Sequence, residues 1–115
     1  MSRLAARFRY AGRGLALAAR QTNLRIMGAV AVVVVAVAIG YDVSTGTWGV
    51  LLLCIGAVLS AELVNSAIET LADRVELNED PAIRDTKDIA AAAVLVISGI
   101  AAATGIVVLW PYIFD

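Results

Sequence analysis

Three long apolar segments, separated by short polar stretches, dominate the pattern of hydrophobic and polar positions along this chain. The first apolar run covers residues 26–41 and consists mostly of Val and Ala. It is shorter than the roughly 20 residues that cross a hydrocarbon core, so we expect its helix to begin near Leu24. A short turn rich in Ser, Thr and Gly follows at residues 42–46, and Trp48 opens the second run. The pattern predicts three transmembrane helices, at residues 24–41, 47–72 and 89–110.

The second and third apolar segments are separated by a charged stretch. We expect residues 74–88 to form a loop there, because Pro81 interrupts any continuous helix. Its acidic side chains are interpreted as a solvated surface; they are Glu76, Glu79, Asp80 and Asp85.

The later half of the second predicted span carries a stripe of polar side chains. At roughly 100° per helical residue, they fall within an arc of about 100°. The members of this polar stripe are Glu62, Asn65, Ser66, Glu69 and Asp73. A carboxylate facing lipid costs at least a few kcal/mol, so the stripe is expected to face protein, water or a ligand.

The N-terminal residues 4–20 have the pattern of an amphipathic helix. Leu4, Phe8 and Leu15 share one face, whereas Arg9 and Arg13 lie nearly opposite. We therefore expect a helix that lies on the membrane surface, although a plain basic anchor without a chemical role fits the same pattern.

Composition places the chain among membrane proteins. It has 115 residues, of which 61% are hydrophobic, and its mean hydropathy is +0.86. This length allows one membrane domain, residues 1–115. The basic N-terminus next to apolar runs favours an anionic membrane leaflet over nucleic acid, which we do not expect as a partner. All nine Lys and Arg residues precede the first span or lie between the second and third, which predicts a cytoplasmic N-terminus and an external C-terminus.

The residue types restrict the available chemistry. The chain has no His and a single Cys, so neither an intrachain disulfide nor a cysteine metal site is expected. Carboxylates beside a basic surface suit metal-assisted phosphoryl transfer, in which they hold Mg2+ on the phosphates. No standard nucleotide-binding motif is present. A proton or cation pathway explains an acidic stripe inside a membrane equally well.

The sequence resembles the prokaryotic diacylglycerol kinase and undecaprenol kinase family. The resemblance rests on Glu62-x-x-Asn65-Ser66-Ala67-Ile68-Glu69-x-x-x-Asp73-Arg74, on Lys87-Asp88-x-x-x-Ala92-Ala93-Val94-Leu95, on Phe8-x-x-Ala11-x-x-Gly14 and on Asn23-x-Arg25-Ile26. It implies an all-α enzyme of a bacterial cytoplasmic (inner) membrane that moves the ATP γ-phosphate to a lipid hydroxyl. It further implies a homotrimer of three-span subunits with a surface helix, whose sites are shared between subunits. Diacylglycerol and undecaprenol both remain open as the acceptor.

The resemblance also implies roles for individual residues. Glu62 matches the proposed general base and Asn65 the neighbour that positions it, whereas Asp73 matches a further active-site acid. Lys87 and Asp88 match a catalytic pair at the start of the third span. The residues expected to bind ATP are Arg9, Arg13, Glu69, Lys87 and Asp88.

The expected ligands of Mg2+ are Glu69 and Gln21. Gln21 departs from the family pattern, which has a Glu there, so we expect altered metal affinity because an amide oxygen ligates Mg2+ weakly. The histidine that usually follows the Arg-Ile pair is Met27 in this chain.

Simpler interpretations stay open for several of these residues. Asn65 and Ser66 are also suited to hydrogen bonds between helices, and Asp73 and Lys87 to a solvated membrane boundary. The alternative function is a small oligomeric membrane transporter, or an ion or proton pathway, that uses Glu62.

Overall fold

The structure, a computed structural model, describes residues 2–75 and 80–115. Within these residues the chain is all α-helical, as expected. The helices are α1 (Arg3–Ala18), α2 (Thr22–Gly40), α3 (Thr45–Val75) and α4 (Pro81–Phe114). Among the described helices, α2, α3 and α4 are long and apolar enough to cross a membrane. The expectation of three spans is therefore confirmed.

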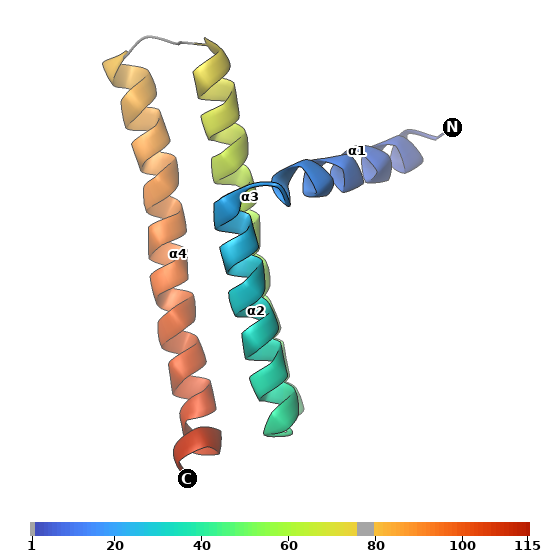
Figure 1. Cartoon of the computed structure of the whole chain (residues 1–115), viewed down its shortest axis with the longest axis vertical. Helices are drawn as coiled ribbons and strands as arrows, with labels where there is room; N and C mark the ends of the chain where they lie inside the picture. Colours follow the sequence, from blue (N-terminus) through green and yellow to red (C-terminus); the bar gives the residue numbers. More distant parts are fainter. Residues whose placement is uncertain (1, 76–79) are drawn as a thin grey trace.

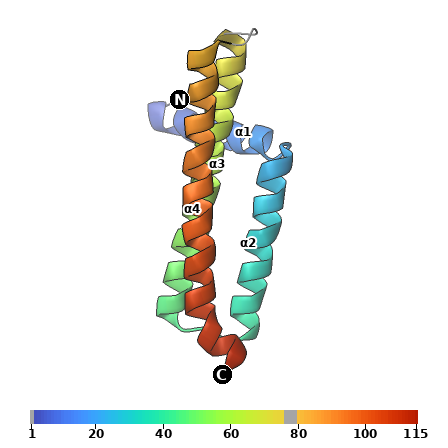
Figure 2. The same cartoon turned by 90° about the vertical axis from the view of Figure 1, so that its left-hand side faces the viewer.

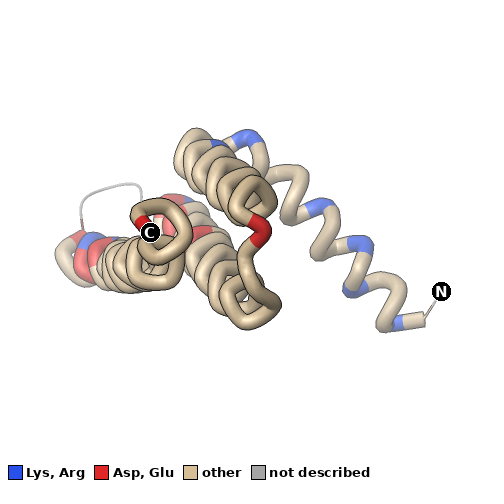
Figure 3. The backbone as a smooth tube through the Cα atoms, turned by 90° about the horizontal axis from the view of Figure 1, so that it is seen from below, with Lys and Arg blue, Asp and Glu red and all other residues tan. Residues whose placement is uncertain are grey.

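The three long helices run side by side, and α3 is the central one. It packs along α4 and, over a shorter length, against α2. The backbones of α2 and α4 approach each other much less, and Figure 2 shows them standing apart, with α3 running largely behind α4. Helix α1 points away from this bundle (Figure 1). Basic residues follow its length, as Figure 3 shows.

Helix α4 begins earlier than the sequence pattern suggested. Asp80 caps its N-terminus, because its Oδ1 accepts hydrogen bonds from the backbone N–H groups of Ala82 and Ile83 at 2.8 and 3.3 Å. Pro81 occupies the first turn, where a missing N–H costs nothing. The expected loop at residues 74–88 was therefore wrong: α3 ends at Val75 and α4 starts at Pro81. Residues 76–79, with the expected surface acids Glu76 and Glu79, lie outside the described part of the chain.

The two longest helices extend beyond the shorter α2. At 1.5 Å per residue, α3 with 31 residues is about 46 Å long and α4 with 34 residues about 51 Å. A hydrocarbon core is about 30 Å thick, which the 19 residues of α2 nearly match at about 28 Å. Figure 1 shows α3 and α4 continuing past the start of α2. We call this extension, residues 69–75 and 81–88, the charged end.

A hydrogen-bonded clasp closes the opposite end of the bundle. The Ser44 backbone N–H in the α2–α3 turn donates to the Tyr112 hydroxyl at 3.0 Å, and Thr47 Oγ1 lies 3.3 Å from the same oxygen. Asp42 enters the turn with φ of 50°, in the left-handed region that Asp tolerates better than most residues. Beneath the clasp, Ala38, Val43 and Leu51 form the buried core. The C-terminal turn of α4 is thereby fixed to the turn between α2 and α3.

Large apolar side chains cover much of the outer surface of the bundle. Leu53, Leu95 and Val107 are each at least 70% exposed, as suits helices that contact lipid or other helices. Phe8 and Leu4 on α1 are 71% and 64% exposed. Their contact with a membrane surface stays a prediction.

Candidate active site

The first half of the polar stripe faces the inside of the bundle. Glu62 is 4% exposed, Asn65 7% and Ser66 8%. Glu69 and Asp73 are exposed, because they lie on the charged end where α2 no longer covers α3. The stripe therefore passes from a buried part to an open part along one helix.

The buried part is joined to α2 through Gln21. The Ser66 Oγ lies 2.6 Å from Gln21 Oε1 and 3.3 Å from Glu62 Oε1. Glu62 and Ser66 lie one turn apart on α3, so their side chains are neighbours, and Gln21 is the residue that precedes α2. We call Gln21, Glu62 and Ser66 the junction cluster, because they meet where α1 gives way to α2.

Asn65 is buried but has an unpaired oxygen. Its Oδ1 finds no hydrogen-bond partner within the described part of the chain. A cavity of about 300 Å3 between α3 and α4 is lined by Asn65 together with small and apolar side chains. Within the described chain, Asn65 is therefore a buried polar residue whose acceptor is left unpaired.

An ion pair connects α3 and α4 at the charged end. Lys87 Nζ lies 2.8 Å from Asp73 Oδ1. Lys87 precedes the apolar residues of α4, which begin at Ile89. The hydrogen bond and the charge of Asp73 raise the pKa of Lys87, and the charges of Glu69 and Asp88 act in the same direction. Its ammonium group is thus positively charged near neutral pH.

The structure does not bring all of the expected nucleotide-binding residues together. Arg9 and Arg13 are exposed on α1, which points away from the bundle (Figure 1). The Arg9 guanidinium lies 5.5 Å from the centre of the Tyr10 ring on the same helix. Asp88 is exposed beside Lys87. Of the expected catalytic and nucleotide-binding residues, Glu69, Asp73, Lys87 and Asp88 lie at the charged end.

The carboxylates at the charged end suit an Mg2+ ion only in part. No group of three or more His, Cys, Asp or Glu side chains that could hold a metal occurs among the described residues. Protein sites for Mg2+ that also bind phosphates often use only one or two carboxylates, and the exposed Glu69 is one turn from Asp73. Gln21, the other expected ligand, has its side-chain oxygen beside Ser66. The residues therefore fit an ion that is completed by nucleotide phosphates and water.

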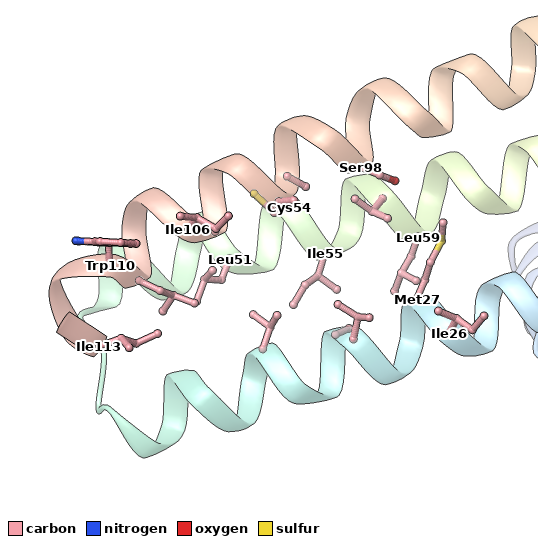
Figure 4. Close-up of a pocket in the computed structure, with 18 of the residues that line it drawn as sticks. Ile26, Met27, Leu51, Cys54, Ile55, Leu59, Ser98, Ile106, Trp110 and Ile113 are labelled. Carbon is pink, nitrogen blue, oxygen red and sulfur yellow. The ribbon is translucent and has the colours of Figure 1, made fainter.

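An apolar cavity of about 630 Å3 lies between α2, α3 and α4. Figure 4 shows side chains of all three helices pointing into it, with Ile26 and Met27 near one end and Trp110 and Ile113 near the other. Leu59 lines it one turn before Glu62, and Ile26 lines it shortly after Gln21. The cavity thus runs from the neighbourhood of the junction cluster to the clasp. The sequence pattern missed both the cavity and the contact of Gln21 with Ser66, since each depends on how α2 packs on α3.

These features define a class: a three-span membrane protein in which a buried carboxylate separates an apolar cavity from an open, charged surface. Comparison with known proteins identifies the family. Residues 9–109 match the prokaryotic diacylglycerol kinase family, and the chain belongs to it. The chain is also 33% identical over 105 residues to the undecaprenol kinase of Bacillus subtilis (strain 168), covering 90% of this chain and 85% of that protein. Family and relative together support a prokaryotic lipid kinase.

Proposed function

We propose that this protein transfers the γ-phosphate of ATP to the hydroxyl of a membrane lipid alcohol, undecaprenol or diacylglycerol, with Mg2+ as cofactor. The observation that carries the proposal is the position of Glu62. It is 4% exposed and lies between the apolar cavity on one side and the ion pair of Lys87 with Asp73 on the other. A lipid kinase needs an apolar region next to a charged one, because its lipid substrate is apolar and ATP is highly charged.

The lipid tail is assigned to the cavity between the three spans. Its lining is apolar, and Leu59 and Ile26 bring one end of it close to the junction cluster. A lipid tail that lies in this cavity places its hydroxyl at Glu62. Over the 11 residues from Glu62 to Leu51, which also lines the cavity, a helix rises about 17 Å. The cavity therefore has room for an extended tail segment of that length.

Each protein group near the reacting atoms then has its own role in the transfer. A Glu62 carboxylate oxygen accepts the hydroxyl proton as the lipid oxygen bonds to the γ-phosphorus and the bond to ADP breaks. Asn65 helps to position that carboxylate. Lys87, with Asp73 and Asp88 beside it, holds and orients phosphate oxygens.

Glu69 is the proposed protein ligand of Mg2+, with Gln21 as a second candidate. The ion, when bound, neutralises charge on the phosphates. Arg9 and Arg13 reach the nucleotide only if α1 lies along the charged surface or if a neighbouring subunit supplies them.

The assembly and its placement are part of the same proposal. The exposed apolar faces of the described chain are what a homotrimer with shared sites would cover. The distribution of Lys and Arg supports a cytoplasmic N-terminus and an external C-terminus in a bacterial inner membrane. In this orientation the charged end meets cytoplasmic ATP.

The test is phosphate transfer from labelled ATP, with Mg2+, to a panel of lipid alcohols that includes undecaprenol, diacylglycerol and a short polyprenol. Ala102 lines the cavity, whereas its neighbour Ala103 does not, so they form a matched pair. Ala102→Phe is expected to lower kcat/KM for the long-chain acceptor about tenfold more than Ala103→Phe does, because about 1.4 kcal/mol of lost packing corresponds to that factor. Phosphorylation of no lipid alcohol by the wild-type protein would contradict the function and favour the ion-pathway alternative.

A further inference from the structure

The Ser66 hydroxyl lies between two side-chain oxygens that can accept its proton. Gln21 Oε1 is 2.6 Å from Ser66 Oγ, and Glu62 Oε1 is 3.3 Å from it. A serine hydroxyl has one proton and two lone pairs, so it can donate to only one of these oxygens at a time. If the proton goes to Gln21, the lone pairs of Ser66 face the carboxylate of Glu62.

That arrangement is unfavourable for an ionised Glu62. The residue is 4% exposed, and a buried carboxylate without hydrogen-bond donors is costly. A half-turn of the Gln21 carboxamide exchanges its oxygen and nitrogen, which have nearly the same shape. Gln21 Nε2 then donates to Ser66 Oγ, and Ser66 donates its proton to Glu62 Oε1. In this arrangement the Ser66 hydroxyl accepts one hydrogen bond and donates one, and the carboxylate of Glu62 receives a donor.

We propose that Gln21, Ser66 and Glu62 form a hydrogen-bond relay in which Ser66 is a positioning residue for the base. This inference rests on the proposed function, because it concerns how Glu62 is aimed at the lipid hydroxyl. The relay joins the start of α2 to α3, so Glu62 is held from two helices. Thr70 fixes the same turn, since its Oγ1 donates to the Ser66 backbone oxygen at 2.9 Å.

The relay also gives a reason for an amide at position 21. A carboxylate there has no proton to donate near neutral pH, and two carboxylates on either side of Ser66 would repel each other unless a cation lay between them. The neutral Gln21 closes the cluster without a cation. In the relay Gln21 supplies a donor to Ser66, so the relay favours Glu69 over Gln21, the second candidate, as the protein ligand of Mg2+.

The first experiment separates positioning from packing by changing Ser66. Ser66→Ala removes the hydroxyl at nearly constant volume, whereas Ser66→Thr keeps it. Loss of a residue that orients a catalytic group commonly costs about 10- to 100-fold in activity. We expect Ser66→Ala to lower kcat about tenfold without changing KM for Mg-ATP, and Ser66→Thr to restore most of the turnover. Equal activities for the Ala and Thr variants would overturn the relay.

The second experiment changes Gln21. Gln21→Met keeps the size of the side chain but removes its donor, and the double variant with Ser66→Ala is expected to be no slower than Ser66→Ala alone, since both act through one chain of bonds. Gln21→Glu is expected to lower kcat, with the Mg2+ concentration for half-maximal activity unchanged. Additive losses in the double variant, or a lower Mg2+ requirement with full turnover in Gln21→Glu, would assign Gln21 to the metal instead.

A third measurement does not depend on activity. In the 15N-labelled protein, the side-chain amide protons of Gln21 are expected to exchange with solvent at least several-fold faster in Ser66→Ala than in the wild type or in Ser66→Thr. Unchanged exchange would contradict the relay even if the protein is a lipid kinase. If these protons exchange more slowly in the wild type than in Ser66→Ala, but the wild type phosphorylates no lipid alcohol, the relay is retained and the proposed function is contradicted.

Discussion

Replacing Glu62 with Gln removes the proposed proton acceptor while leaving the shape of the junction cluster intact. The Gln side chain keeps a carbonyl oxygen that can accept a hydrogen bond from Ser66, which lies 3.3 Å from Glu62 Oε1. Little packing is therefore lost at this buried position. A change in activity would report the missing base and its charge.

The size of the expected loss follows from the chemistry. A positioned general base contributes about 10²- to 10⁴-fold to rate. Phosphoryl transfer through a loose transition state depends mostly on positioning and charge, which places the expected loss near the lower end, at about 10²-fold in kcat. At 1.36 kcal/mol for each factor of ten, this is about 2.7 kcal/mol of transition-state stabilisation. Mg-ATP affinity is expected to change little, because Glu62 is buried away from the charged end.

The assay compares lipid phosphorylation and Mg-ATP affinity for Glu62→Gln and Glu69→Gln in the same detergent. Glu69 is exposed on the same face of α3, so its variant is the matched control and is expected to weaken Mg-ATP binding itself. The size of the solubilised particle shows whether each variant keeps its assembly. Turnover of Glu62→Gln within about threefold of wild type, less than the tenfold that 1.36 kcal/mol represents, would refute the assignment of the base.

Three further predictions concern the charged end, the clasp and the topology. Lys87→Met is expected to raise KM for Mg-ATP about tenfold, since one lost phosphate contact of about 1.4 kcal/mol has that effect. An unchanged KM would mean that Lys87 forms the ion pair with Asp73 but does not contact the nucleotide. Tyr112→Phe removes the hydroxyl that Ser44 and Thr47 contact, so thermal unfolding should begin a few degrees lower, and an unaltered unfolding temperature would show that the clasp adds no stability. Reporter tags at the two termini are expected to lie in opposite compartments, and detection of both in the cytoplasm would contradict the three-span orientation.

The period of the polar stripe was sufficient to predict which face of α3 turns inward. Glu62 and Ser66 are buried as that pattern requires. The partner of Ser66 could not be predicted from spacing, because Gln21 is 45 residues away and the contact depends on how α2 meets α3. The start of α4 was placed too late because the apolar signal begins at Ile89, although Asp80 and Pro81 together are a helix-start signal.

Two other features could not be predicted from the sequence, for different reasons. The apolar cavity is lined by side chains of α2, α3 and α4, and hydropathy along a chain carries no information about how three helices enclose a space. The Tyr112 hydroxyl contacts the α2–α3 turn, and the apolar pattern of the third predicted span does not predict this contact.

The apolar cavity lined by α2, α3 and α4 also bears on how substrate concentration controls the rate. Under the proposed function, a lipid alcohol enters this cavity from the bilayer and never crosses bulk water. The relevant concentration is then the mole fraction of acceptor in the membrane plane. Adding inert lipid at a constant total amount of acceptor would slow the reaction by dilution in two dimensions, whereas changing the water volume would not.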